Sequence, residues 1–272
     1  MSHRLFLNTI LLGGTTLQKL DAIAAAGFDD LELWREDLKQ YGMGASALAG
    51  ELQKRNLGLT DFQVLRDFDG AAGDQRTTKR QEALGMLDTA VSLGSRVVQM
   101  PSNVREDADA SRIEEDLRWL DAEAAARGLR IAYEPMGWST INDTLPKLWA
   151  SIEGAGAAHI DVVVDAFHIF AHGRDLSDLA VIPVDRIANV QFCDFDDVVP
   201  VSRLPDAGKH RRLLPGAGHF PLKAMAKQLQ DAGYAGPVGV EVFNDGLKQQ
   251  PPGQVAVDAM VALKAVWGAG GA

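Results

Sequence analysis

Oxygen-bearing side chains stand near the ends of four apolar segments in the second half of the chain. They occur in the sequences YEP, VVDAFH, VQFCD and VEVFND, and they are Glu134, Asp165, Gln191 and Glu241. Burying several carboxylates together is unfavourable unless a cation neutralises them. Carboxylate and amide oxygens form a hard ligand set, which favours Mn²⁺, Mg²⁺ or Co²⁺ over a zinc site built from thiolates. The pattern therefore predicts a divalent-metal site.

His168 follows Asp165 by three residues. An imidazole titrates near neutral pH, so His168 could remove a proton from a substrate. It could instead be a metal ligand or a histidine with only a structural role. Similarly, each acidic residue alone could be an ion-pair partner of a neighbouring helix, and Gln191 could be a packing amide. Four such residues at the ends of successive segments are harder to explain in this way.

The elements that must position these residues are short apolar segments that alternate with longer amphipathic ones. Several short segments are nearly continuous in Val, Ile, Leu and Phe, which is typical of strands buried on both faces of a parallel sheet. The predicted strands are 5–10, 30–34, 59–64, 96–101, 130–135, 161–167, 187–192 and 238–243. The predicted helices are 16–27, 82–94, 111–128, 144–156, 221–234 and 254–268.

This alternation predicts an α/β fold, a single-domain (β/α)₈ TIM barrel over residues 1–272. An open doubly wound sheet is the alternative, but it usually carries a G-x-G-x-x-G loop after its first strand. The segment LLGGTT (11–16) does not match that pattern. Active sites of TIM barrels lie at the C-terminal ends of the strands, where the four predicted ligands stand. Cys193 is expected to pack outward under a helix.

Composition excludes several classes of protein. The chain has 37 acidic and 27 basic residues and a net charge of −10, which argues against nucleic-acid binding through a basic surface. It contains no apolar run of about 18 residues, so no membrane span is expected. The single cysteine allows no disulfide within the chain and suits a cytoplasmic location.

The motifs YEP, VVDAFH, VQFCD, RRLLPGAG (211–218) and VEVFN occur in the order seen in the xylose-isomerase-like TIM barrels, the sugar phosphate isomerase/epimerase family. The sequence resembles that family over nearly its whole length. In the family, a divalent metal held by ligands from four strands binds an α-hydroxyketone or keto sugar. The resemblance implies that the metal ligands are Glu134, Asp165, Gln191 and Glu241. It also implies that Glu134 and His168 are catalytic, with His168 as the base.

Within this family the chain most resembles the bacterial 3-dehydroshikimate dehydratases. FQVLRDFDG (62–70) and VFNDGLKQQP (242–251) are similar to stretches of those enzymes, and Gln191 stands where they use glutamine. The resemblance implies a lyase that dehydrates 3-dehydroshikimate to protocatechuate after proton abstraction next to a metal-bound ketone. Two departures put the substrate in question. Thr140 and Ile141 replace an Arg-His pair, and Val64 replaces a proline.

Other activities fit the same resemblance. An isomerase or epimerase of a keto-inositol or ketose would use the same type of ligand set, although the keto-inositol isomerases normally have histidine at the position of Gln191. A DNA-repair endonuclease is a third hypothesis, because some relatives of this barrel cut abasic sites. The net charge of −10 and the lack of extra histidines argue against it. A non-catalytic binding barrel is the remaining alternative.

The expected partner is a small-molecule keto acid or keto sugar. Cationic candidates for its carboxylate or phosphate are Arg66, His210, Arg212 and Lys248; Arg212 is favoured because a guanidinium binds such groups in bidentate fashion. Arg66 could instead pair only with Asp67 or Asp69. Glu32 and Asn103 could bind a substrate hydroxyl or form structural contacts. The segment PGAGH (215–219) could close over the site or be an ordinary turn, and with the last helix it could form a homo-oligomer face.

Overall fold

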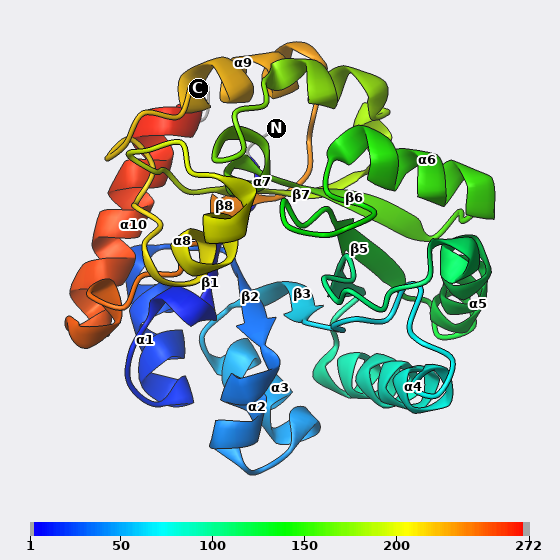
Figure 1. The fold of residues 1–272 in the computed structure, drawn as a ribbon. Helices are drawn as coiled ribbons and strands as arrows, with labels where there is room; N and C mark the ends of the chain where they lie inside the picture. The colour runs from blue at the N-terminus through cyan, green and yellow to red at the C-terminus, as the bar shows by residue number, and fades with distance from the viewer. Residues whose placement is uncertain (1–2, 269–272) are drawn as a thin grey trace.

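The computed structural model describes residues 3–268. Eight parallel strands form a closed barrel in sequence order, and β1 pairs with β8 to close it. Helices surround the strands (Figure 1). The predicted (β/α)₈ barrel is therefore confirmed. The predicted domain limits include residues 1–2 and 269–272, which lie outside the described residues, so the extent 1–272 stays a prediction.

All eight predicted strands are present, with small differences at their ends. Their bounds are β1 Leu5–Asn8, β2 Asp30–Trp34, β3 Gly58–Gln63, β4 Val97–Pro101, β5 Arg130–Glu134, β6 Ile160–Asp165, β7 Ile187–Phe192 and β8 Val238–Val240. The largest correction is at β8, which ends three residues before the predicted limit, so that Glu241 follows the strand. β6 ends at Asp165 because the Asp165 carboxylate accepts the N–H of Phe167 and starts a short helix.

The helices include elements that the sequence pattern did not reveal. Their bounds are α1 Thr16–Ala26, α2 Arg35–Tyr41, α3 Ala45–Lys54, α4 Arg76–Leu93, α5 Ile113–Ala125, α6 Leu145–Ala155, α7 Ala166–Phe170, α8 Leu204–His210, α9 Leu222–Asp231 and α10 Pro252–Trp267. The prediction missed α2, α3, α7 and α8, three of which are too short for a clear helical period. It also began α4 six residues late, because that helix opens with the polar segment RTTKRQ.

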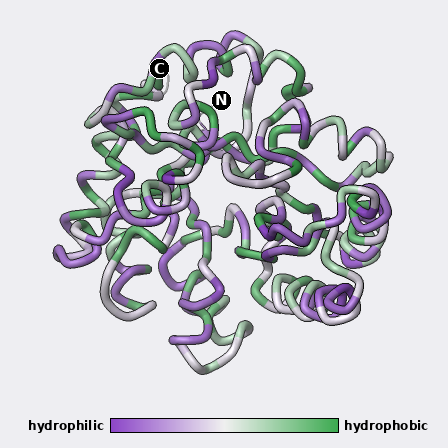
Figure 2. The backbone as a smooth tube through the Cα atoms, in the orientation of Figure 1, coloured by the Kyte–Doolittle hydropathy of each residue, from purple (hydrophilic) through white to green (hydrophobic). Residues whose placement is uncertain are grey.

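Local sequence signals set where helices begin and end. Thr15 and Gln18 form a capping box at the start of α1, and Gly27 ends the helix in the left-handed region at φ 85°. Thr144 likewise caps α6, which ends at Gly156. Figure 2 shows hydrophobic and hydrophilic residues mixed along the outer helices, as amphipathic helices that cover a barrel require. Within the described residues, no helix has both the length and the apolar character needed to cross a membrane.

Alternation along the strands separates an apolar layer from a polar interior. Outward-facing residues such as Leu31, Val164 and Val240 are fully buried in the core between the strands and the helices. Many inward-facing residues towards the C-terminal ends of the strands are polar and at most 4% exposed: Asn8, Glu32, Asp61, Gln63, Gln99, Glu134, Asp165, Asn189, Gln191 and Glu241. A polar interior of this kind requires internal partners for every group.

Candidate metal centre and active site

The four predicted ligands come from neighbouring strands at one end of the barrel. Glu134 is the last residue of β5, Asp165 is the last residue of β6, and Glu241 directly follows β8. Gln191, on β7, lies beside Asp165 in the strand register. All four side chains are buried, with at most 4% of the residue exposed. The fold thus brings side chains that are up to 107 positions apart to the C-terminal end of the barrel.

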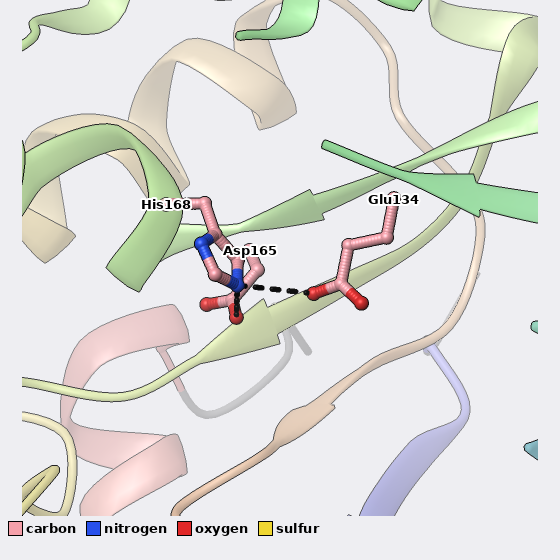
Figure 3. Close-up of side chains that lie close together, drawn as sticks. All are labelled: Glu134, Asp165 and His168. Carbon is pink, nitrogen blue, oxygen red and sulfur yellow. Dashed lines mark ion pairs between the residues drawn. The ribbon is translucent and has the colours of Figure 1, made fainter. Parts of the chain in front are cut away.

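His168 joins this group through the first turn of α7. Its Nε2 atom lies 3.6 Å from Glu134 Oε1 and 3.6 Å from Asp165 Oδ2 (Figure 3). The three residues offer ligand atoms within 4.8 Å of one another and could hold a metal ion. The His168 Nε2 atom is buried and has no hydrogen-bond partner among the described residues. The geometry allows His168 to act as a ligand or to act on a molecule bound at that ion.

Contacts of the other ring nitrogen define the state of His168. The backbone N–H of Gly137 donates to His168 Nδ1 at 3.0 Å. A neutral imidazole whose Nδ1 accepts a hydrogen bond carries its proton on Nε2. Burial lowers the pKa of His168 to about 4, an effect that nearby Asp165 opposes and Arg212 adds to. The ring is therefore neutral at pH 7 and presents an N–H towards the carboxylates.

Arg212 is the cation closest to the carboxylates. Its Nη1 donates to Asp165 Oδ2 at 2.7 Å and to Glu241 Oε2 at 3.1 Å, and its Nε donates to the carbonyl of Gly208. Its guanidinium also lies over the ring of Phe167, 4.5 Å from the centroid. Burial disfavours the charge, but Asp165 and the other acidic groups keep the pKa of Arg212 above its ordinary value. Arg212 therefore binds the carboxylates of the protein itself.

The charge balance of the cluster suits a divalent cation. Glu134, Asp165 and Glu241 carry three negative charges when ionised, and Arg212 supplies one positive charge. Burial, together with Glu241 and Asp165, raises the pKa of Glu134 well above its usual range. Burial also raises the pKa of Glu241 to about 8, although Arg212 opposes the shift. A doubly charged ion would neutralise the remaining two negative charges, so the residues fit such a group.

Gln191 leaves an oxygen atom for such a cation. Its Nε2 donates to Glu32 Oε1 at 2.8 Å and to Gln99 Oε1 at 3.3 Å. Its Oε1 is buried without a hydrogen-bond partner among residues 3–268. A buried carbonyl oxygen without a partner is unfavourable, and a hard cation is the type of ligand that satisfies it.

A cavity of about 540 Å³ opens above the carboxylates. Its wall contains aromatic rings and basic side chains, and its floor contains part of the cluster. The lining includes Trp34, Arg66, Glu134, Trp138, His168, Arg212, Glu241 and Lys248. A volume of this size accepts a small ring compound.

Two basic residues of the wall, Arg66 and Lys248, form no ion pair within residues 3–268. The guanidinium of Arg66 lies over the ring of Trp34, 5.0 Å from the centroid. The alternative that Arg66 only pairs with Asp67 or Asp69 is wrong. Asp69 accepts from the Tyr133 hydroxyl at 2.5 Å and from the Asn103 N–H at 2.9 Å, and no ion pair or side-chain hydrogen bond joins Arg66 to either aspartate within residues 3–268. Both cations remain available for an anionic group.

Three predicted substrate-binding residues do not line this cavity. Asn103 is buried and donates to the backbone carbonyl of Asp69. His210 lies on the surface, where its Nδ1 contacts Asp245 at 2.9 Å. Glu32 is fully buried beneath the cluster and contacts Gln191. The structure therefore separates these residues from Arg66, Arg212 and Lys248, which do line the wall.

After β7, the expectation for Cys193 needs correction, and the segment PGAGH has the second of the two forms considered for it. Cys193 does not pack outward: its Sγ lies 3.9 Å from Asp165 Oδ1, because residues two apart along a strand face the same side and Gln191 faces inward. The segment PGAGH is an ordinary anchored turn. Asp194 accepts the N–H groups of Gly216 and Phe220, and a side chain at Gly218 would collide with the backbone of Phe195.

Sequence reasoning missed two residues that contact the predicted ligands. Gln99 Nε2 donates to Glu134 Oε2 at 2.8 Å, and Asn8 Nδ2 donates to Glu241 Oε1 at 2.8 Å. A signal was available in both cases, because each polar residue interrupts an apolar strand, in LFLN and in VVQMP. Both residues lie on strands of the first half of the barrel, β1 and β4, whereas the predicted ligands lie on or directly after the last four strands.

The model of the xylose isomerase-like TIM barrel family matches residues 20–266. The chain belongs to this family. The resemblance inferred from the sequence motifs is thereby confirmed, and the cluster at the ends of β5–β8 occupies the end of the barrel where TIM-barrel active sites lie.

This xylose isomerase-like barrel is similar to proteins with two kinds of activity. A 3-dehydroshikimate dehydratase of Pseudomonas putida is 34% identical over 261 residues, which cover 94% of this chain and 40% of that protein. An inosose isomerase of Halalkalibacterium halodurans is 32% identical over 169 residues, covering 60% of this chain and 58% of that protein.

Among solved structures, a xylose isomerase-like TIM barrel/4-hydroxyphenylpyruvate dioxygenase fusion protein superimposes with a TM-score of 0.90 at 32% identity, covering 97% of this chain and 42% of that chain. This xylose isomerase-like barrel thus spans about two fifths of the dehydratase and of the fusion protein.

Proposed function

We propose that this chain is a divalent-metal-dependent lyase that removes water from 3-dehydroshikimate and forms protocatechuate. The observation that carries the proposal is a buried group of three carboxylates with one guanidinium, below a cavity whose wall holds cations that have no ion-pair partner among the described residues. The similarity to the dehydratase of Pseudomonas putida supports the choice of substrate. A small keto acid is thus the proposed partner and the cytoplasm the proposed location.

Glu134, Asp165, Gln191 and Glu241 would hold the cation, with Mn²⁺, Mg²⁺ or Co²⁺ as the candidates. When bound, such a cation supplies a Lewis acid that polarises a ketone oxygen and acidifies the adjacent C–H bond. The fit rests on the two unbalanced negative charges of the cluster and on the unpartnered Oε1 of Gln191. Arg212 keeps the carboxylates of Asp165 and Glu241 in place.

His168 is proposed to move the proton at its Nε2 atom. The hydrogen bond from Gly137 to Nδ1 opposes this role as long as it persists, because it leaves the proton of the neutral ring on Nε2. A base at Nε2 needs the other tautomer, so Gly137 must turn its N–H away from Nδ1 in the loaded site. The low pKa of His168, about 4, ensures that the ring is uncharged and available as an acceptor near neutral pH.

Arg66 and Lys248 are proposed to bind the substrate carboxylate. Both line the cavity, and partial burial lowers the pKa of Lys248, with Lys19 adding to the effect. A carboxylate between these cations would hold the ring so that its ketone faces the cluster. Loss of a proton from the carbon next to the ketone, and of the hydroxyl from the following carbon as water, gives a ring that becomes aromatic on enolisation.

The test is a direct assay. Purified protein loaded with Mn²⁺ should produce the absorbance of protocatechuate from 3-dehydroshikimate, and protein treated with EDTA should not. The proposal fails if folded, metal-loaded protein produces no protocatechuate.

An isomerase or epimerase of a keto-inositol or ketose is the second candidate. The similarity to an inosose isomerase favours it, and so does the loop after β5. At the two positions where the dehydratases have an Arg-His pair, this chain places an exposed Thr140 and Ile141, which packs on the core. Incorporation of solvent deuterium into inosose without loss of water would favour this candidate. Production of protocatechuate without exchange into inosose would exclude it.

A further inference from the structure

Beneath the proposed metal ligands lies a layer of buried polar side chains to which the proposed reaction gives no task. Glu32 is at its centre and is fully buried. Its Oε1 accepts from Gln191 Nε2 at 2.8 Å, and its Oε2 accepts from Asn8 Nδ2 at 3.0 Å. The carboxyl of Asp61 is a neighbour of Glu32 in this layer. Both oxygens of the Glu32 carboxyl are therefore engaged by amide donors of the protein.

The orientation of the Asn8 amide is fixed by the backbone. Asn8 Oδ1 accepts the N–H of Ile10 at 2.9 Å, and a backbone N–H can only donate. The Nδ2 of Asn8 must therefore be the atom that points to Glu32 Oε2 and to Glu241 Oε1, at 3.0 and 2.8 Å. Once the oxygen and nitrogen of this amide are assigned, the donor and acceptor roles of the side chains next to it can be assigned as well.

Glu32 in turn determines the orientation of the Gln191 amide. Because a carboxylate oxygen accepts, the atom of Gln191 that faces Glu32 must be its NH₂ group, and Oε1 must face away. That Oε1 is the buried oxygen without a partner among the described residues. The same NH₂ group also donates to Gln99 Oε1, which leaves Gln99 Nε2 to donate to Glu134 Oε2. One carboxylate thus determines how two amides face.

We propose that Glu32 is a positioning residue of the metal site, which sets the Gln191 amide so that its oxygen faces the cation and its NH₂ group faces away. The inference rests on the proposed metal site, and it replaces the expectation that Glu32 binds a substrate hydroxyl. Glu32 contacts the ligand Gln191 directly, and through Asn8 and Gln99 the same layer reaches Glu241 and Glu134. Partners of this kind orient ligands and tune the affinity for the metal.

The substitution Glu32→Gln tests the role of orientation. Asn8 stays a donor, so the new amide must offer its oxygen to Asn8 and its NH₂ group to Gln191. Gln191 then has to turn its own oxygen towards position 32 and its NH₂ group towards the cation. The dissociation constant for Mn²⁺, measured by titration calorimetry, should rise by about tenfold or more. A dissociation constant equal to that of the wild type would overturn the inference.

The exchange Glu32→Gln with Gln191→Glu restores the match of donor and acceptor between positions 32 and 191, while Gln99 Oε1 loses the donor at position 191 and keeps the NH₂ group of Gln63, at 3.4 Å. Glu at position 191 accepts from the NH₂ group at position 32 and still offers an oxygen to the cation, and the total charge is that of the wild type. Its Mn²⁺ affinity should return to within about threefold of the wild type. If the single variant does not fold, the Mn²⁺ affinity of the exchange variant alone tests the inference. An exchange variant that does not fold, or binds Mn²⁺ as weakly as the single variant, overturns the inference.

Asp61→Asn is the matched control for charge. Asp61 lies in the same layer and is fully buried, but it contacts Gln63, Asn189 and Glu32 and none of the proposed ligands. Its Mn²⁺ affinity should stay within about threefold of the wild type. A loss as large as that of Glu32→Gln would show that charge, and not orientation, is what matters, and would overturn the inference.

These outcomes are distinct from failure of the proposed function. A wild type that binds no Mn²⁺ removes the proposed metal site itself. A wild type that binds Mn²⁺ but does not convert 3-dehydroshikimate removes the proposed reaction and leaves the role of Glu32 testable. Equal binding by the wild type and Glu32→Gln removes only the positioning role.

Discussion

Buried carboxylates at the two ends of this barrel have different partners. At the N-terminal end, Asp30 receives two hydrogen bonds from Arg4, and Asp161 is paired with both Arg130 and Arg186. At the C-terminal end, Glu134, Asp165 and Glu241 have the single guanidinium of Arg212 among them. The charges of the buried carboxylates are therefore neutralised by arginines at the N-terminal end, whereas negative charge is in excess at the C-terminal end.

The difference separates carboxylates that stabilise the fold from carboxylates that can do chemistry. A paired acid at the N-terminal end links the start of one strand to the next and has no capacity for another cation. The acids at the C-terminal end can still bind another cation, although their buried negative charge is unfavourable without it. In TIM barrels the first kind of site contributes to stability and the second kind to catalysis. The local balance of charge thus distinguishes acids that the sequence alone does not.

The largest expected effect comes from removing an acid at the C-terminal end. Glu134→Ala should weaken Mn²⁺ binding at least about 100-fold and lower kcat/KM about 10³-fold. Its matched control at the other end is Asp161→Ala, which should keep Mn²⁺ affinity and lose about 1–3 kcal/mol of unfolding free energy, because two arginines lose their partner. Calorimetric titration measures the Mn²⁺ affinity of the two variants, and urea unfolding measures their unfolding free energy. Loss of Mn²⁺ affinity in Asp161→Ala would break the comparison.

The next effect concerns His168, which lies at the C-terminal end of the barrel but is uncharged and so does not contribute to the charge balance of the cluster. His168→Ala should lower kcat by about 10² to 10³-fold and leave the fold and the Mn²⁺ affinity close to those of the wild type. Steady-state kinetics and metal titration together make this distinction. Unchanged turnover would assign the residue a structural role, and lost metal would assign it to the ligands.

A smaller effect is expected at Arg66, where a cation without an acidic partner lines the cavity. Arg66→Gln should raise KM for 3-dehydroshikimate about fivefold to tenfold with kcat nearly unchanged, because a charge-assisted contact made equally in the bound and transition states is lost. Arg127→Gln is the control, since Arg127 pairs with Asp88 and Glu123 on the outer helices. A similar KM for the two variants would contradict the proposed carboxylate contact.

The last expected effect is on stability and not on activity, and it concerns Asp69, a buried acid that no arginine contacts within residues 3–268. Burial raises the pKa of Asp69 to about 7, although the hydroxyl of Tyr133 opposes the shift. The folded state therefore holds a proton that the unfolded chain releases near pH 4, and the unfolding free energy should fall as pH rises from about 4 to 7.

In the Asp69→Asn variant that fall should be reduced by at most about 1.4 kcal/mol per pH unit, the value for one proton. Urea unfolding of both proteins at pH 5 and pH 7 measures the difference. An equal pH dependence of the two proteins would contradict the raised pKa of Asp69.

The sequence was sufficient for the barrel and for where the ligand-type side chains would gather. Short apolar segments that alternate with amphipathic ones indicate a parallel barrel, and the C-terminal ends of its strands meet at one end, so neither prediction depends on side-chain detail. The contacts across the barrel could not be predicted in this way. Gln191 and Glu32 are 159 positions apart, and their meeting depends on the closure of all eight strands. The pairing of Arg212 with Asp165, 47 positions away, depends on how the segment between α8 and α9 lies against the end of β6.

The basic residues at the cavity wall also have a kinetic consequence. The chain as a whole carries a net charge of −10, yet Arg66, Lys209 and Lys248 all line its cavity, together with Asp67. These cations would attract a small anion that the net charge of the chain repels. Such a field guides the anion and raises its rate of association, and salt weakens the effect. The cavity would then attract its anion before any contact forms.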